Sequence, residues 1–179
     1  MRVFLAVSLD EGTRHRLAHV VSGHVAEMPG RPVPPDKWHL TLRFLGEVEE
    51  MALERIRHAL DDADLGGAFP MAWGGLGDFP RASRASVLWV GVVRGAEALE
   101  ALDWAVDEAL DTTGFEAEDR PFRPHLTIAR LRPPEDVRSV VRGDPLPDVA
   151  MRVDRVTLYE SRLGAGGAKY EALDEFELR

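Results

Sequence analysis

The strongest constraint on the fold of this chain is a tripeptide, His-Leu-Thr, that occurs twice, at residues 39–41 and 125–127. Each copy follows a proline-containing connector and continues into an apolar segment. In an extended strand, side chains two residues apart project from the same face. We therefore expect two strands that each present one imidazole and one hydroxyl on one face. Leu40, Leu42 and Phe44 are expected on the opposite face.

The two halves of the chain share one order of elements: an apolar strand, an amphipathic helix, a proline-containing connector and a His-Leu-Thr strand. This order indicates a weak internal duplication. Strands that do not alternate regularly with helices predict an α+β fold with antiparallel or mixed sheets and helices packed outside them. We expect one domain over residues 1–179, built as two pseudo-symmetric lobes at about 1–80 and 81–179 that can exchange segments. A central cleft would separate the lobes.

The composition excludes several functional classes. The absence of cysteine rules out disulfides, thiolate metal sites and thiol nucleophiles, and it fits a reducing cytoplasm. No apolar run approaches the roughly 20 residues of a membrane helix, so we expect a soluble protein without a membrane partner. We also expect a cytoplasmic monomer. A net charge of −9 disfavours a long nucleic-acid groove, but a cleft with a few local cations can still hold a short terminal nucleotide.

The two histidines are the candidate catalytic residues. Imidazole has the side-chain pKa closest to neutrality, so His39 and His125 can serve as one acid and one base. Opening a phosphodiester with water requires both, because the water loses a proton and the departing sugar oxygen gains one. Thr41 and Thr127 are placed to donate hydrogen bonds to phosphate oxygens.

Two arginines are further candidates for phosphate contacts. In a regular strand Arg43 shares the face of His39, whereas Arg130 lies on the face opposite His125. Arg130 therefore needs a strand end or a bulge to reach the site. His15 and His19 share a helical face, but no glutamate completes a zinc-binding motif. We expect neither a metal site nor a cofactor.

The chain resembles the 2H phosphoesterases, in particular the RNA 2′,3′-cyclic phosphodiesterases that are also called 2′-5′ RNA ligases. The similar segments are Phe4-Leu-Ala-Val, His39-Leu-Thr-Leu-Arg-Phe-Leu-Gly46, Pro124-His-Leu-Thr-Ile-Ala-Arg130 and Leu158-Tyr-Glu-Ser-Arg162. The resemblance spans nearly the whole chain. It implies a bilobed fold in which both motifs line the cleft, and metal-independent opening of a 2′,3′-cyclic phosphate to a 2′-phosphomonoester.

The resemblance also implies individual roles. His39 would be the proton donor to the O3′ leaving group, His125 the proton acceptor that activates water, and Thr41 and Thr127 the phosphate-holding residues. Reverse 2′-5′ ligation of RNA would be a secondary activity. Two alternatives stay open: a phosphodiesterase for small cyclic nucleotides or ADP-ribose cyclic phosphate, and a non-catalytic module that binds RNA ends.

Overall fold

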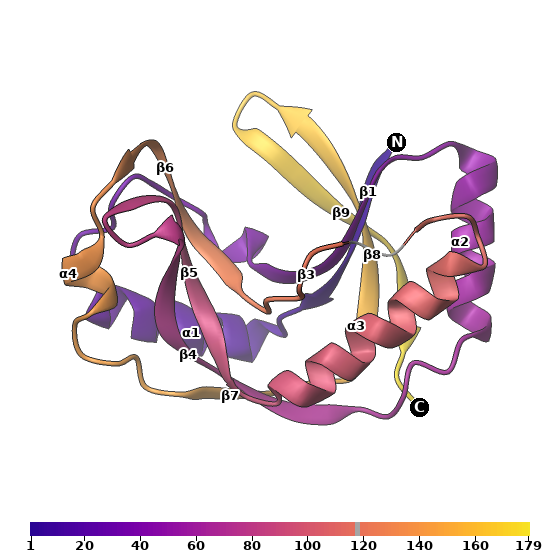
Figure 1. Ribbon diagram of the computed structural model, residues 1–179, viewed down its shortest axis with the longest axis horizontal. Coiled ribbons are helices and arrows are strands. Elements are labelled where there is room, and N and C mark those ends of the chain that lie inside the picture. The colour runs from indigo at the N-terminus through magenta and orange to yellow at the C-terminus, as the bar shows by residue number, and fades with distance from the viewer. Residues whose placement is uncertain (117–118) are drawn as a thin grey trace.

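The protein consists of two antiparallel sheets with associated helices, as Figure 1 shows. The computed structural model describes residues 1–116 and 119–179. The strands are β1 (Arg2–Ser8), β2 (Arg31–Pro32), β3 (His39–Glu47), β4 (Phe69–Arg81), β5 (Arg84–Arg94), β6 (Leu126–Glu135), β7 (Val149–Val153), β8 (Arg155–Gly164) and β9 (Gly167–Glu177). The helices are α1 (Glu11–His24), α2 (Glu50–Asp62), α3 (Ala96–Asp111) and α4 (Arg138–Val141), with a 3₁₀ turn at Pro35–Lys37.

The two sheets have matching strand orders. The first sheet runs β3-β1-β8-β9, and the second contains β6-β5-β4-β7 with the short β2 added beside β6. Each motif strand therefore pairs with the strand that opens its own half of the chain. The third strand of each sheet comes from the other half, since β8 pairs with β1 and β4 pairs with β5. The α+β duplication expected from the sequence is confirmed, and the halves exchange strands.

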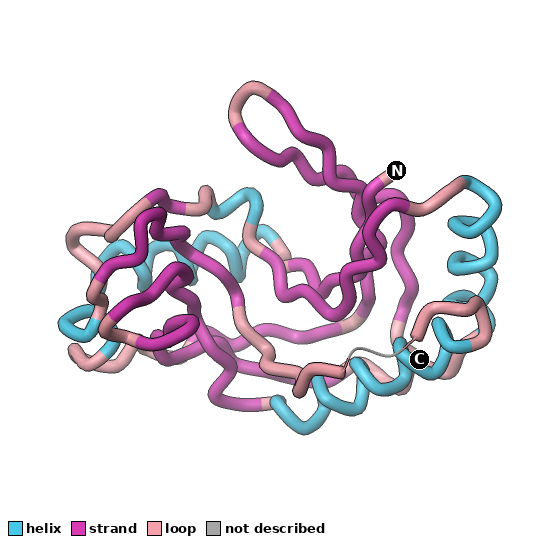
Figure 2. Tube along the Cα trace, turned by 45° about the horizontal axis from the view of Figure 1, so that its top comes forward, coloured by secondary structure: helices cyan, strands magenta, loops and turns pink. Residues whose placement is uncertain are grey.

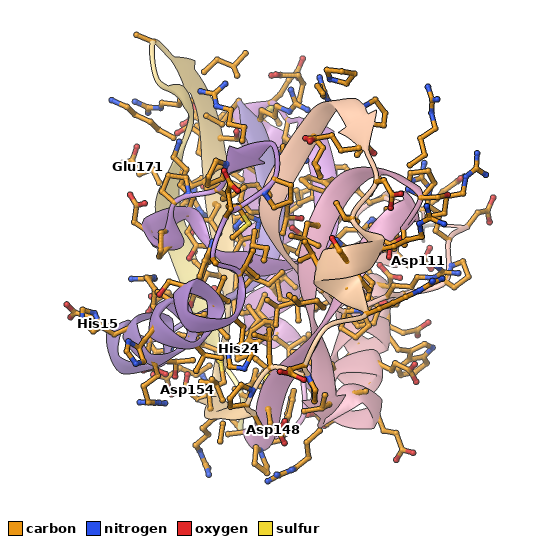
Figure 3. All side chains as sticks on the ribbon, turned by 90° about the vertical axis from the view of Figure 1, so that its left-hand side faces the viewer. His15, His24, Asp111, Asp148, Asp154 and Glu171 are labelled. Atoms are coloured by element: carbon orange, nitrogen blue, oxygen red, sulfur yellow. The ribbon has the colours of Figure 1, made fainter. Side chains whose placement is uncertain are left out.

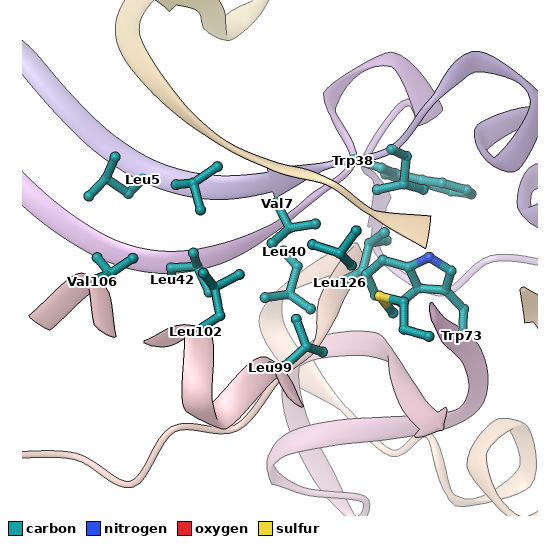
Figure 4. Close-up of a cluster of buried hydrophobic side chains, with 14 of the residues drawn as sticks. Leu5, Val7, Trp38, Leu40, Leu42, Trp73, Leu99, Leu102, Val106 and Leu126 are labelled. Atoms are coloured by element: carbon teal, nitrogen blue, oxygen red, sulfur yellow. The ribbon is translucent and has the colours of Figure 1, made fainter. Parts of the chain in front are cut away.

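The helices are exchanged in the same way. Helix α3 follows β5 of the second sheet but packs on the first sheet, where Leu99 and Leu102 lie beside Leu40 and Leu42 of β3, as Figure 4 shows. Helix α1 follows β1 of the first sheet but contacts β7 of the second. Each fully buried leucine contributes roughly 1.5–3 kcal/mol, so the packing of α3 helps to hold the motif strand β3 in position.

Trp38 anchors the connector that leads into β3. Its side chain is buried, and its Nε1 donates a hydrogen bond of 2.9 Å to the carbonyl oxygen of Val33. Part of that connector forms β2, which pairs with β6 of the second sheet. The segment immediately before His39 is therefore tied to the strand that follows His125.

The β8–β9 hairpin extends beyond the other strands of the first sheet, as Figure 2 shows. It is paired from Arg155 and Glu177 up to Gly164 and Gly167 at the turn. Within the described residues, no helix combines the length and the apolar character needed to cross a membrane.

Candidate active site

The two motif histidines occupy equivalent positions at the start of β3 and β6. His39 is the first residue of β3, and His125 directly precedes Leu126, the first residue of β6. These strands belong to different sheets but contact each other. The structure thus brings together two histidines that are far apart in the sequence.

Both imidazoles are held by the backbone in the same way. Nδ1 of His39 lies 2.9 Å from the carbonyl oxygen of Lys37, and Nδ1 of His125 lies 2.6 Å from that of Arg123. A carbonyl oxygen only accepts, so Nδ1 carries the hydrogen in both rings. The other ring nitrogen, Nε2, is left available for proton transfer. This is the arrangement that a general acid or base requires.

Aromatic rings surround each imidazole. The ring centroid of His39 lies 4.9 Å from that of Phe4 and 5.2 Å from that of Tyr170, which meets it edge-on. His125 lies 5.0 Å from Phe79, also edge-on, and 6.0 Å from Trp89. These rings restrict the orientation of both imidazoles and reduce their contact with water.

The electrostatic environment of His39 includes charged groups of the second motif strand. Burial lowers the pKa of His39 below its ordinary value of 6.5, and the positive charges of Arg130 and His125 lower it further. The hydrogen bond to the Lys37 carbonyl oxygen acts in the opposite direction. Groups from the second sheet are therefore close enough to act on the charge of an imidazole in the first.

A β-bulge follows each threonine and changes which side chains share its face. In β3, Thr41 pairs with Ala6 and Phe44 pairs with Phe4, because Leu42 is the extra residue of the bulge. Directly paired residues point to the same side of a sheet, and Phe4 and Ala6 are two apart in β1. Phe44 therefore shares the face of Thr41, which we call the motif face.

The second motif has a bulge at the equivalent residue, Ile128. Thr127 pairs with Trp89 and Arg130 pairs with Val87, and these partners are two apart in β5. Arg130 consequently lies on the motif face of the second sheet, where its side chain is exposed. The structure therefore contains the bulge that the sequence analysis required for Arg130 to lie on the face of the second motif.

Arg43 and Phe44 exchange the faces expected for them. Arg43 is only 6% exposed and forms an ion pair with Asp107 of α3, on the helix-covered side of the first sheet. Phe44 is 63% exposed. The expectation that Arg43 shares the face of His39 is wrong, as is the expectation that Phe44 is buried. The cause is the single extra residue of the bulge, which reverses the alternation of side chains.

The other histidines singled out in the sequence lie on exposed helical surface. His15 projects outward from α1, as Figure 3 shows, and His19 is exposed on the same helix. In the described part of the chain, no three His, Asp or Glu side chains are grouped so that they could hold a metal ion.

The sequence did not reveal the ring neighbours of the two histidines. Tyr170 reaches His39 from β9, the last strand of the first sheet, and Phe79 reaches His125 from β4. Tyr170 lies in a segment expected to be a strand, but that expectation does not give the register of pairing. Residues 78–81 were expected to form a loop, whereas β4 continues through them and carries Phe79. Phe4 and Tyr159, whose ring centroid lies 6.2 Å from that of His39, belonged to segments that carried the family resemblance.

This fold and its paired His-x-Thr strands define a class of phosphoesterase. A family model described as the 2′-5′ RNA ligase superfamily matches residues 27–165, and the chain belongs to this family. The family membership expected from the sequence is confirmed.

Individual relatives match over almost their full length. The RNA 2′,3′-cyclic phosphodiesterase of Methanothermobacter thermautotrophicus is 34% identical and is matched over 99% of both chains. The enzyme of that name from Escherichia coli is 30% identical, over 99% of this chain and 96% of its own. The predicted enzyme class agrees with these names.

Solved structures of relatives have the same fold. The crystal structure of E. coli LigT complexed with 3′-AMP superposes with a TM-score of 0.82 at 28% identity, covering 99% of this chain and 97% of that one. The structure of TT0787 from Thermus thermophilus gives a TM-score of 0.78 at 31% identity, covering 100% and 98%.

Proposed function

We propose that this protein hydrolyses the 2′,3′-cyclic phosphate at an RNA end or on a nucleotide, giving a 2′-phosphomonoester and a free 3′-hydroxyl. The observation that carries the proposal is the equivalent tethering of two imidazoles, one of which is acted on by the charge of the other. Relatives named RNA 2′,3′-cyclic phosphodiesterase support the substrate class, and the relative crystallised with 3′-AMP supports a nucleotide-sized ligand.

The proposed reaction has one nucleophile and one leaving group on opposite sides of phosphorus. Nε2 of His125 accepts a proton from water, and the water oxygen forms a new bond to phosphorus. The bond from phosphorus to O3′ breaks, and Nε2 of His39 donates its proton to O3′. Proton exchange with solvent then restores both rings. Each proton transfer contributes roughly 10²- to 10⁴-fold to the rate.

The remaining groups of the motif faces stabilise the phosphate. Hydroxyls of Thr41 and Thr127 donate to its nonbridging oxygens, and Arg130 adds a positive charge where negative charge is redistributed. The negative charge of the bound phosphate also counteracts the effect of the positive charges that lower the pKa of His39. Substrate binding therefore favours the protonated form of His39, which the acid role requires. Arg43 is engaged by Asp107 and is not part of this set.

The same groups can also join two RNA ends. A 5′-hydroxyl that replaces water as the nucleophile would lose its proton to His125 and form a bond to phosphorus, while the bond to O3′ breaks and His39 protonates O3′, which leaves a 2′-5′ linkage. Water is present at far higher concentration than any RNA end, so we propose that hydrolysis dominates and ligation is secondary.

Product analysis tests the proposed function. The purified protein is incubated with 2′,3′-cyclic AMP in the presence of EDTA, and the 2′- and 3′-phosphate products are separated. We expect EDTA-resistant formation of the 2′-phosphate. His39→Ala and His125→Ala should each lower kcat by about 10²-fold or more. His58→Ala, which removes an exposed imidazole from α2, is the matched control.

Two outcomes would contradict the proposal. If kcat of both histidine variants stayed within a few-fold of the parental value, the proposed acid–base mechanism would be wrong. Tight binding of the nucleotide without any product would instead favour a non-catalytic module that binds RNA ends.

A further inference from the structure

The only two lysines of the chain lie at the turn of the β8–β9 hairpin. Nζ of Lys37 is 3.9 Å from the point where a Cβ on Gly167 would stand, and Cε of Lys169 is 3.8 Å from the corresponding point on Gly164. Gly164 and Gly167 pair with each other across the turn. Two lysines from distant parts of the sequence therefore flank one turn.

This turn is adjacent to the candidate active site. The carbonyl oxygen of Lys37 holds the imidazole of His39, and Tyr170, the neighbour of Lys169, lies edge-on to the same imidazole at 5.2 Å. Lys37 thus contacts His39 through its own backbone. Lys169 precedes Tyr170 in β9, so its side chain leaves the strand on the opposite face and lies along the turn beside Gly164. Figure 2 shows that the hairpin projects past the rest of the first sheet, so its turn is accessible to a ligand.

Both ammonium groups are available to an anion. Among the described residues, neither Lys37 nor Lys169 forms an ion pair with a carboxylate. Residues 163–170 contain no Asp or Glu, although the whole chain has a net charge of −9. Glu171, the nearest acidic residue of β9, lies 3.6 Å from Arg162 in an ion pair. A local positive site on an acidic protein attracts phosphate more selectively than a uniformly basic surface would.

The direction of the proposed reaction places the rest of an RNA strand over the first sheet, on the side of the β8–β9 turn. If His39 protonates O3′, the ribose of the terminal nucleotide lies on the His39 side of phosphorus and the attacking water on the His125 side. The 5′ oxygen of that ribose, and the phosphodiester attached to it, then continue over the first sheet. The β8–β9 turn is the projecting part of that sheet.

We propose that Lys37 and Lys169 bind the phosphodiester on the 5′ side of the terminal nucleotide, with Tyr170 supporting the adjacent ribose or base. This subsite makes a cyclic-phosphate-ended oligonucleotide a better substrate than a cyclic mononucleotide, which lacks that phosphodiester. The proposal rests on the proposed function, because only that function sets the direction of the strand.

A comparison of two substrates tests the subsite. The ratio of kcat/KM for a trinucleotide with a 2′,3′-cyclic end to kcat/KM for 2′,3′-cyclic AMP is measured for the parent, Lys37→Gln, Lys169→Gln and the double variant. We expect the ratio to fall about 2- to 5-fold for each single variant and about 10-fold for the double variant. Lys169→Arg, which keeps the charge, should retain most of the parental ratio.

Salt dependence gives an independent readout. For a trinucleotide ending in a 2′-phosphate, the slope of log Kd against log salt should decrease by about 0.7 for each lysine removed, the value for one contact to a single strand. Arg142→Gln is the matched control, since it removes one exposed cation beside α4, which lies at the left-hand edge of Figure 1, away from the hairpin. For Arg142→Gln, the ratio of the two kcat/KM values and the slope of log Kd against log salt should both equal those of the parent.

The results separate the two proposals. Parental turnover of both substrates with an unchanged ratio in the double variant would overturn the subsite and leave the proposed function standing. A parent that turns over neither substrate would overturn the proposed function and the subsite with it. Thermal unfolding of each variant checks that the substitutions leave the fold intact, and Lys169→Gln alone suffices if the double variant unfolds.

Discussion

Phe44 and Arg130 occupy equivalent places in the two halves of the protein, each on the motif face and each beyond the bulge that follows a motif threonine. Otherwise the halves match closely, in strand order and in the tethering of the histidines. At this one place the first sheet presents an exposed ring and the second an exposed guanidinium. The pair therefore distinguishes the two sides of an otherwise pseudo-symmetric site, and it can orient a ligand that has an aromatic base and a charged phosphate.

Replacing Arg130 with glutamine should affect both turnover and the titration of His39. The charge of Arg130 lowers the pKa of His39, so its removal should raise that pKa toward 6.5. Loss of a phosphate contact should lower kcat/KM by about 10²-fold. NMR titration of the His39 ring in parent and variant measures the first effect. An unchanged pKa would mean that Arg130 does not act on His39 in solution.

The pH dependence of kcat/KM should reflect the lowered pKa of His39. This quantity reports ionisation in the free protein, where burial and the charges of Arg130 and His125 disfavour protonated His39. If His39 is the acid, kcat/KM falls as pH rises through a pKa that lies below 6.5. The corresponding fall in kcat should occur at higher pH, because bound phosphate favours the protonated ring. A kcat/KM profile that still rises above pH 6.5 would contradict the acid role.

The sequence predicted the motif strands, the α+β class and the equivalent placement of the two histidines, because these depend on short-range alternation and on the repeated tripeptide. The catalytic roles of the histidines stay predictions. It failed at Arg43 and Phe44, because a bulge depends on pairing with the neighbouring strand, and the alternation of side chains alone does not locate it. For Arg130, regular alternation predicts the face opposite His125 unless a bulge or a strand end intervenes. The bulge at Ile128 is such an interruption, and it places Arg130 on the motif face. Tyr170 was not identified, since its approach to His39 depends on the register of β8 and β9.

A substrate with a better leaving group separates the acid from the base. Sulfur in place of O3′ of the cyclic phosphate leaves readily as a thiolate, so its departure depends far less on a proton donor. Turnover of this analogue by His39→Ala should approach that of the parent, whereas His125→Ala should remain slow because water still needs a base. The reverse pattern would assign the acid role to His125.

The ion pair of Arg43 with Asp107 links β3 to α3 on the side away from the motif face. Truncation of Arg43 leaves the carboxylate of Asp107 without its counter-charge in a largely buried setting, which costs about 3 kcal/mol. We expect Arg43→Ala to lower the free energy of unfolding in urea by about that amount. Its kcat/KM, measured where the variant is fully folded, should stay within a few-fold of the parent, because Thr41 and His39 keep their places on the other face of β3. Arg130→Gln supplies the opposite pattern, with low turnover and nearly parental stability, since its side chain is exposed. A stable Arg43→Ala protein that has lost turnover would place the guanidinium at the substrate and contradict the assignment of Arg43 to the helix-covered face of β3.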